Sequence, residues 1–195
     1  PRPPPSERLI IMKTFSGLGV SAGIGQAPAL LVEPAPGLPA RDPKGDTDDD
    51  VARVTAALSK VADRLDARAL EADPSAIGVL MATAMMARDP GLTSSVRTHL
   101  EEGDGPAHAL WGAIDDFCAQ LTAAGGYLAE RVTDLHNVRD RALAVLQGLP
   151  EPGVPAFDSP VILVAEDLAP ADTATLDPEL VRGLVTAAGL SLIHI

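Results

Sequence analysis

Residues 161–176 read Val161-Ile-Leu-Val-Ala-Glu-Asp-Leu-Ala-Pro-Ala-Asp-Thr-Ala-Thr-Leu176 and open with a continuous apolar run. A short apolar run of this kind is typical of a strand that is buried on both faces of a parallel sheet. The stretch from Asp172 to Leu176 predicts a helical turn, and residues 180–187 end in a second strand-like run. The C-terminal part of the chain therefore has α/β character.

The N-terminal part carries a related signal. Residues 15–25 contain glycine at positions 17, 19, 23 and 25, and Ala29-Leu-Leu-Val32 follows them. We expect a strand, a glycine-rich turn and a second strand over this region. Residues 33–46 are rich in proline and glycine, which indicates a linker.

Residues 46–148 have the pattern of packed helices. Apolar residues recur at helical spacing after the acidic run Asp46–Asp50, and the stripe comprises Val51, Val54, Leu58, Val61 and Leu65. Asp73-Pro74 and Asp89-Pro90 are helix start signals, while Gly103, Gly125-Gly126 and Gly148 mark helix ends. The pattern predicts a bundle of four or five helices. In the second helix we expect Met81 and Met85 on the core face and Met86 at its edge.

Strand signals before and after the helices predict one discontinuous α/β domain that is interrupted by an all-α helical-bundle subdomain. We assign residues 1–13 to a disordered leader, with a start residue at Met12, and residues 14–45 to the first part of the α/β domain and its linker. Residues 46–148 form the helical subdomain, and residues 149–195 form the second part of the α/β domain. We expect the tail over 190–195 to be foreign sequence.

Composition excludes several classes of protein. The 195 residues carry a net charge of -12, which opposes binding to nucleic acid or to an anionic membrane. Aromatic residues make up 3%, too few for base-stacking platforms. A single cysteine, Cys118, allows no internal disulfide and no structural zinc site, and no apolar run is long enough to cross a bilayer. These features predict a cytoplasmic protein.

Four motifs resemble the N-terminal half of Enzyme I, the phosphoenolpyruvate-protein phosphotransferase family of the bacterial sugar phosphotransferase system. Together they cover about residues 14–189, and the most specific is the 161–176 stretch, which is similar to the family pattern Asp-Leu-x-Pro-Ser-x-Thr-Ala-x-Leu. The other three are Gly17-Leu-Gly-Val-Ser-Ala-Gly-Ile-Gly25, Leu80-Met-Ala-Thr-Ala-Met-Met-Ala-Arg-Asp-Pro-Gly-Leu92 and Glu130-Arg-Val-Thr-Asp-Leu-His-Asn-Val-Arg-Asp-Arg141.

The resemblance implies a swivelling α/β phosphohistidine domain that relays phosphate through a histidine to the carrier HPr, which docks on the helices. Counting forward from Ala188-Gly189, which fit the family's phosphate loop, places His194 in register with the phosphorylated histidine. The chain departs from the loop at Leu190 to Ile193, where the family has the second glycine and the hydroxyls that serve the phosphate. Ala169 also replaces a common threonine. Met85 and Met86 are the implied HPr contacts.

In the family, the phosphoenolpyruvate site, the Mg²⁺ site and the dimer contact lie in a C-terminal barrel. We expect this chain to be truncated before that barrel, to need no cofactor of its own, and to be unable to use phosphoenolpyruvate alone. Two alternatives remain: a catalytically inactive helical protein-binding module, and the phosphotransfer subunit of a dihydroxyacetone kinase system.

The remaining chemically active residues have structural interpretations. His99, His108 and His136 fall off the main apolar faces of their helices, which predicts exposed or boundary positions. Cys118 adjoins an apolar face and is expected to be a buried small side chain. The Asp46–Asp50 run lacks the calcium-loop pattern and is expected to be a solvated helix start.

Overall fold

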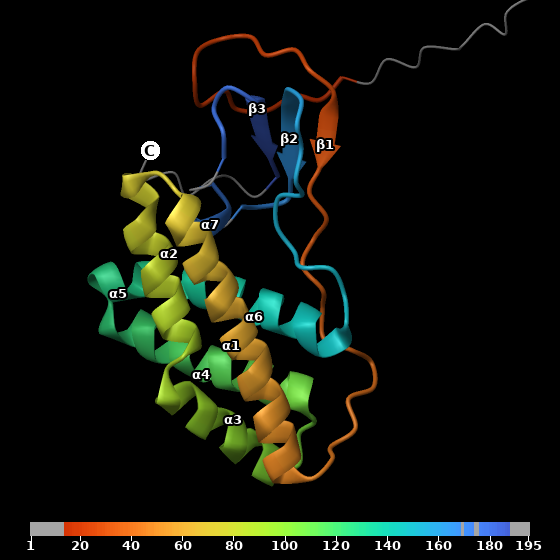
Figure 1. Cartoon of the computed structure of the whole chain (residues 1–195), viewed down its shortest axis with the longest axis vertical. Helices are drawn as coiled ribbons and strands as arrows, with labels where there is room; N and C mark the ends of the chain where they lie inside the picture. Colours follow the sequence, from red (N-terminus) through yellow and green to blue (C-terminus); the bar gives the residue numbers. More distant parts are fainter. Residues whose placement is uncertain (1–13, 169, 174–175, 188–195) are drawn as a thin grey trace, which may run out of the picture.

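The computed structural model describes residues 14–168, 170–173 and 176–187. It consists of a group of packed helices below a small parallel sheet, joined by two extended segments (Figure 1). Within these residues, no helix combines the length and the apolar character that a membrane span requires.

The long helix α1 spans Thr47–Glu71 and begins as the sequence predicts. The Asp46 side chain accepts hydrogen bonds from the backbone N–H groups of Asp48 and Asp49, which caps the helix start. The predicted apolar stripe faces the core, and its central members Val54, Leu58, Val61 and Leu65 are buried. Burial of this stripe on the other helices is therefore what holds α1 in place.

Five further helices follow, so the helical part has six where the sequence predicts four or five, because the last predicted helix is divided at Arg131. α2 spans Pro74–Ala87 and α3 spans Pro90–Glu102, and in each a preceding aspartate, Asp73 or Asp89, caps the first turn. α4 spans Pro106–Ala124, α5 is a short helix over Gly126–Glu130, and α6 spans Val132–Gln147. Gly103 and Gly148 end α3 and α6 in the left-handed conformation that glycine adopts without steric cost.

The strands from the two sides of the helical region form one sheet. β1 spans Ala29–Leu31, β2 spans Val161–Ala165 and β3 spans Val181–Thr186, in the order β1-β2-β3 with all neighbours parallel. β1 pairs with β2, with Leu30 opposite Leu163. The expectation that the two separated parts of the chain meet in space is therefore confirmed.

The first predicted strand is wrong, because no strand forms between residues 14 and 28. Side chains that a strand would have packed lie in solvent, with Phe15 88% and Ile24 101% exposed. Gly25 passes so close to the backbone carbonyl of Arg182 that a Cβ would clash there. Four glycines in this segment offer few side chains to pack and weaken pairing, so the segment crosses the start of β3 without joining the sheet.

The helices and the sheet have separate apolar cores. The helical core draws on α1, α2, α3, α4 and α6, whereas the sheet core gathers Val32, Val161, Leu163, Ala165 and Leu168. The one-turn helix α7, Pro170–Thr173, follows β2 closely in the chain, yet its Ala171 belongs to the helical core. α7 therefore connects the two cores.

Candidate functional site

A cleft of about 430 Å³ opens where the carboxyl ends of β1 and β2 face α6. Glu33 lies just beyond β1, Glu166 and Asp167 lie just beyond β2, and α6 contributes Thr133, His136, Asn137, Arg139 and Asp140. Because the strands are parallel, β3 also ends at this edge, at Thr186. The carboxyl edge of a parallel sheet is where α/β proteins most often bind ligands.

Carboxylates dominate the cleft wall. Five carboxylates line the cleft, and Arg139 is the one arginine among its described lining residues; the five are Glu33, Asp140, Glu166, Asp167 and Asp172. Arg139 is held in place, because its Nε donates to Asp140 at 2.9 Å and its guanidinium stacks 3.8 Å from the ring centroid of Trp111. An anionic group that entered this cleft would meet mostly negative charge from the described residues.

His136 is the imidazole of the cleft wall, and it is half-buried. Burial, followed by the charge of Arg139, lowers the pKa of His136 below its ordinary value. The ring is therefore neutral at neutral pH, with one nitrogen able to donate a hydrogen bond and the other able to accept one.

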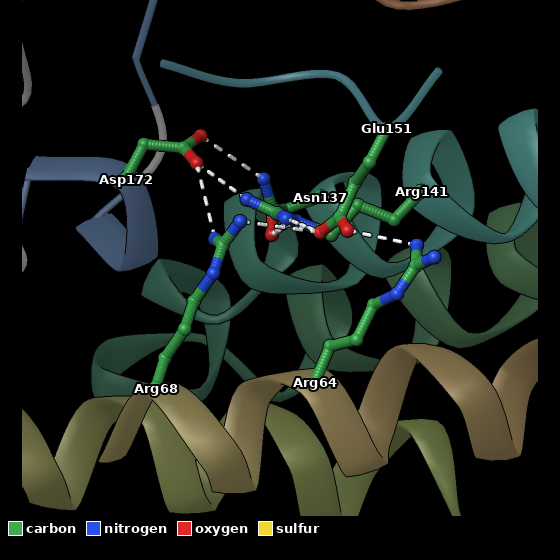
Figure 2. A network of polar contacts seen from close by, with 6 residues as sticks. All are labelled: Arg64, Arg68, Asn137, Arg141, Glu151 and Asp172. Carbon is green, nitrogen blue, oxygen red and sulfur yellow. Dashed lines mark hydrogen bonds and ion pairs between the residues drawn. The ribbon is translucent and has the colours of Figure 1, made fainter. Parts of the chain in front are cut away.

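A network of charged side chains joins the helices to the segment that leads into the sheet (Figure 2). The side chain of Arg141, on α6, is only 1% exposed, and its Nη1 and Nη2 donate to Glu151 and Asp172. Arg141 Nε donates to Asn137 at 2.8 Å, and Arg64 on α1 donates to Glu151 at 2.8 Å. These contacts link α1, α6, α7 and the segment after α6 in one network.

Arg68 completes this network from α1. It donates to Glu151 at 3.4 Å and lies 3.9 Å from Asp172 (Figure 2). Burial, together with the nearby charge of Arg141, lowers the pKa of Arg68. Sequence reasoning missed this network, because arginines in an amphipathic helix are expected in solvent.

Two of the three methionines of α2 differ from expectation. Met81 is 50% and Met85 71% exposed, whereas Met86 is partly buried and packs against the helical core. The prediction that Met81 and Met85 face the core is therefore wrong, and Met86 lies at the edge of the core as expected. α2 is apolar on several faces, so the sequence pattern did not single out its buried face, which comprises Ala76, Leu80, Thr83, Ala84 and Ala87.

Met81 and Met85 belong to an exposed face of α2, and charged side chains lie at its C-terminal end. Arg88, one turn beyond Met85, donates to Asp66 and Asp63 of α1 at 2.7 Å each, and the side chain of Asp63 is 73% exposed. We name Met81, Met85, Arg88, Asp63 and Asp66 the α1–α2 face. Flexible apolar side chains beside acidic groups suit a partner with an apolar patch and a basic rim.

The other singled-out residues have structural roles. His99 contacts Asp116 at 3.0 Å and Asp104 at 3.4 Å, and His108 contacts Asp42, so both are boundary residues as expected. Cys118 is buried as predicted, and burial raises the pKa of its thiol. In the Asp46–Asp50 run, Asp50 differs from expectation because it is buried, bonded to Gly45 N–H and to Arg53.

The predicted phosphate-loop residues Gly189 and His194 lie outside the described residues, as does Ala169. Among the residues that are described, no three His, Cys, Asp or Glu side chains are grouped so that they could hold a metal ion. The residues that the structure describes therefore do not fit a bound Mg²⁺.

Comparison with known proteins identifies relatives of this chain. Residues 16–131 match the family described as PEP-utilising enzyme, N-terminal. The chain is 43% identical over 182 residues to a phosphoenolpyruvate-protein phosphotransferase of Streptomyces coelicolor. This match covers 90% of this chain and 32% of that protein. It is 31% identical over 183 residues to the phosphoenolpyruvate-protein phosphotransferase of Lactococcus lactis, again covering 90% of this chain and 32% of that protein.

Solved structures agree with these relatives. A solution structure of Enzyme I superposes with a TM-score of 0.71 at 25% identity, covering 85% of this chain and 70% of that chain. The N-terminal domain of the nitrogen-branch Enzyme 1 shares the fold, with a TM-score of 0.57 at 22% identity over 84% of this chain and 69% of that one. The chain spans about a third of the length of the curated relatives it matches. The resemblance drawn from the four motifs is thus confirmed: the chain belongs to the PEP-utilising enzyme N-terminal family and corresponds to the N-terminal domain of Enzyme I.

Proposed function

We propose that this chain is the phosphohistidine-bearing N-terminal domain of a cytoplasmic phosphoenolpyruvate-protein phosphotransferase and relays phosphate to HPr. The observation that carries the proposal is the family match together with the edge where β1, β2 and β3 end side by side. The two alternatives, an inactive binding module and a dihydroxyacetone kinase subunit, are not favoured by these relatives.

The acceptor in this proposal is a histidine in the segment that follows β3, and register assigns it to His194. A neutral imidazole nitrogen attacks the phosphorus, a new N–P bond forms, and the bond to the donor's leaving group breaks. In the relay to HPr, the N–P bond on this chain breaks as one forms on a histidine of HPr. The reverse step loads the chain from phosphorylated HPr without any further reactant.

The α1–α2 face is the proposed docking surface for HPr. Met81 and Met85 are exposed apolar side chains, and Arg88, one turn beyond Met85, pairs with the carboxylates of Asp63 and Asp66 on α1. This arrangement matches a carrier whose active histidine is surrounded by apolar and basic groups. The sequence also assigns Met86 to the HPr contact. In this proposal Met86 stabilises the surface, because it packs against the helical core.

In the full-length relatives, phosphoenolpyruvate and Mg²⁺ are proposed to bind in the part of the protein that this chain does not match. The chain spans 32% of the length of those proteins, and its described residues contain no group of metal ligands. We therefore propose that this chain exchanges phosphate with HPr but does not take it from phosphoenolpyruvate unaided. The dimer contact of the family is assigned to the same unmatched part.

The test is transfer from phosphorylated HPr. HPr is first phosphorylated with phosphoenolpyruvate and catalytic full-length Enzyme I, then purified and mixed with the chain, and intact mass spectrometry follows the phosphate. We expect the chain to gain one phosphate, His194→Ala to gain none, and His99→Ala, which changes a histidine outside the cleft, to gain it as the parent does. An unlabelled parent chain contradicts the proposal, and label retained by His194→Ala rejects His194 as the acceptor.

A further inference from the structure

α7 lies in the helical part, although it directly follows a strand of the sheet. Among described residues beyond position 148, Ala171 alone belongs to the helical core, and it is fully buried there. The next residue, Asp172, has a side chain that is 8% exposed and bonds to Arg141. Within the described residues, α7 thus attaches the sheet-bearing part to the helices through the buried Ala171 and through Asp172, which also contacts Arg68 and Asn137.

Among the ion-paired groups of the network that includes Asp172, cations outnumber anions. Three guanidiniums, those of Arg64, Arg68 and Arg141, share two carboxylates, those of Glu151 and Asp172 (Figure 2). The lowered pKa of Arg68, caused by burial and by Arg141, is consistent with this excess. Removal of one carboxylate charge would leave three buried or half-buried cations against one anion, so repulsion would replace attraction.

Little else joins the two parts. The sheet core and the helical core share no described residue, and the connections before α1 and after α6 are extended segments (Figure 1). The contacts between elements of the two parts that extend over several residues are those of α7 with α2 and α6. The orientation of the sheet on the helices therefore depends on α7.

We propose that α7 is an ionic latch: the Arg141 network holds it in the helical part, and loss of the charge of Asp172 or Glu151 releases the sheet-bearing part from the helices. This proposal concerns the conformation of the chain and does not depend on phosphoryl transfer. It predicts a transition in which the helices stay folded while the distance between helices and sheet becomes variable.

The test measures that distance. Cysteines replace the exposed Lys60 on α1 and Glu179 beside β3 in a Cys118→Ala background, and pulsed electron resonance between spin labels on them gives the distance distribution. We expect one narrow distribution for this parent. Asp172→Asn and Glu151→Gln, which keep the side-chain shapes, should raise the released population about 100-fold and broaden the distribution.

Two matched variants separate the latch from general loss of ion pairs. Arg68→Gln removes the excess cation and should keep the narrow distribution. Asp48→Asn breaks an exposed pair with Arg97 and should also keep it. Circular dichroism of each variant reports whether the helices remain folded.

The latch is supported if both Asp172→Asn and Glu151→Gln broaden the distance distribution while the helices remain folded. A narrow distribution in both variants overturns it, and so does an Arg68→Gln chain that opens as far as Asp172→Asn. If Asp172→Asn loses helix content, Glu151→Gln decides by itself, because Glu151 lies outside α7.

Discussion

Asp42 accepts two hydrogen bonds from His108, a residue 66 positions further along the chain. Its Oδ2 lies 2.8 Å from the backbone nitrogen of His108 and 3.0 Å from the ring nitrogen Nδ1. The N-cap of α4 is Gly105, which has no side chain to accept such a bond. The linker before α1 therefore supplies the missing cap for α4 and is anchored by it.

Replacement of Asp42 by alanine should destabilise the chain through this remote cap. We expect the free energy of unfolding to fall by about 1 kcal/mol, the usual effect of losing an N-cap, because His108 N–H loses its acceptor. Urea denaturation measures the change. Asp42→Asn, which keeps an acceptor oxygen, should lose less, and equal losses for the two variants would contradict the capping role.

Gly153→Ala should perturb the Arg141 network through sterics. Gly153 has φ +117°, and a Cβ there would lie 2.7 Å from Oδ1 of Asp172 and 3.3 Å from Nη2 of Arg141. Gly125 is the matched control, because its φ of +69° is also positive but open space surrounds it. Backbone strain should cost each alanine variant about 1–3 kcal/mol, and Gly153→Ala should lose more than Gly125→Ala in urea denaturation. Equal losses of stability in the two variants would show that the Arg141 network accommodates the added methyl group without further destabilisation.

Asp134 should make stability fall as the pH rises. Its side chain is 4% exposed, and burial raises its pKa above 3.8, although the positively charged Arg131 opposes this by donating a hydrogen bond to the carboxylate at 3.0 Å. Between 3.8 and the higher folded pKa, the folded state binds more protons than the unfolded state, so stability is lost through that window. Asp134→Asn should remove this loss and raise stability at neutral pH.

Asp73 offers a control of opposite sign. Hydrogen bonds from the backbone and side chain of Ser75 lower the pKa of Asp73, so its stabilisation is present above 3.8 and is lost as the pH falls through the lower folded value. Asp73→Asn should therefore lose stability at neutral pH, where Asp134→Asn gains it. Urea denaturation from about pH 7 to about pH 3 compares them. If Asp134→Asn instead loses as much stability at neutral pH as Asp73→Asn does, the pairing of Asp134 with Arg131 outweighs the cost of burying its charge.

Local signals predicted the helices and the sheet well. The α1 stripe, the Asp-Pro starts of α2 and α3 and the glycine ends of α3 and α6 act within a few residues, so the sequence alone carries them. β2 was predictable because a short, fully apolar run rich in β-branched residues is typical of a strand buried on both faces. The strand prediction for residues 15–25 failed because a strand needs paired backbone over several residues, and this segment only crosses the start of β3 at Gly25.

The site was less predictable than the fold. Arg141 looks like a surface residue of α6, and its burial depends on partners 10 and 31 positions away. Met85 and Met86 are adjacent on a helix with several apolar faces, so only packing against α1 decides which one is exposed. Long-range contacts of this kind leave no periodic pattern in the sequence.

The α1–α2 face can be tested independently of phosphoryl transfer. Met85 is 71% exposed, so its replacement by serine should leave the free energy of unfolding unchanged within about 0.5 kcal/mol. If HPr docks on this face, Met85→Ser should weaken binding about tenfold, the loss typical of an apolar contact near the centre of an interface. Isothermal titration calorimetry with unphosphorylated HPr measures it.

Leu149→Ser is the control for Met85→Ser, because Leu149 is also exposed, at 48%, but lies in the segment after α6. It removes a comparable apolar side chain and should leave HPr affinity unchanged. Asp63→Asn should weaken binding less than Met85→Ser at physiological ionic strength, and its effect should shrink as salt is added, because a 73% exposed carboxylate is screened. If Met85→Ser and Leu149→Ser weaken HPr binding equally, nonspecific apolar contact would explain both losses. The proposal that HPr docks on the α1–α2 face would then be wrong.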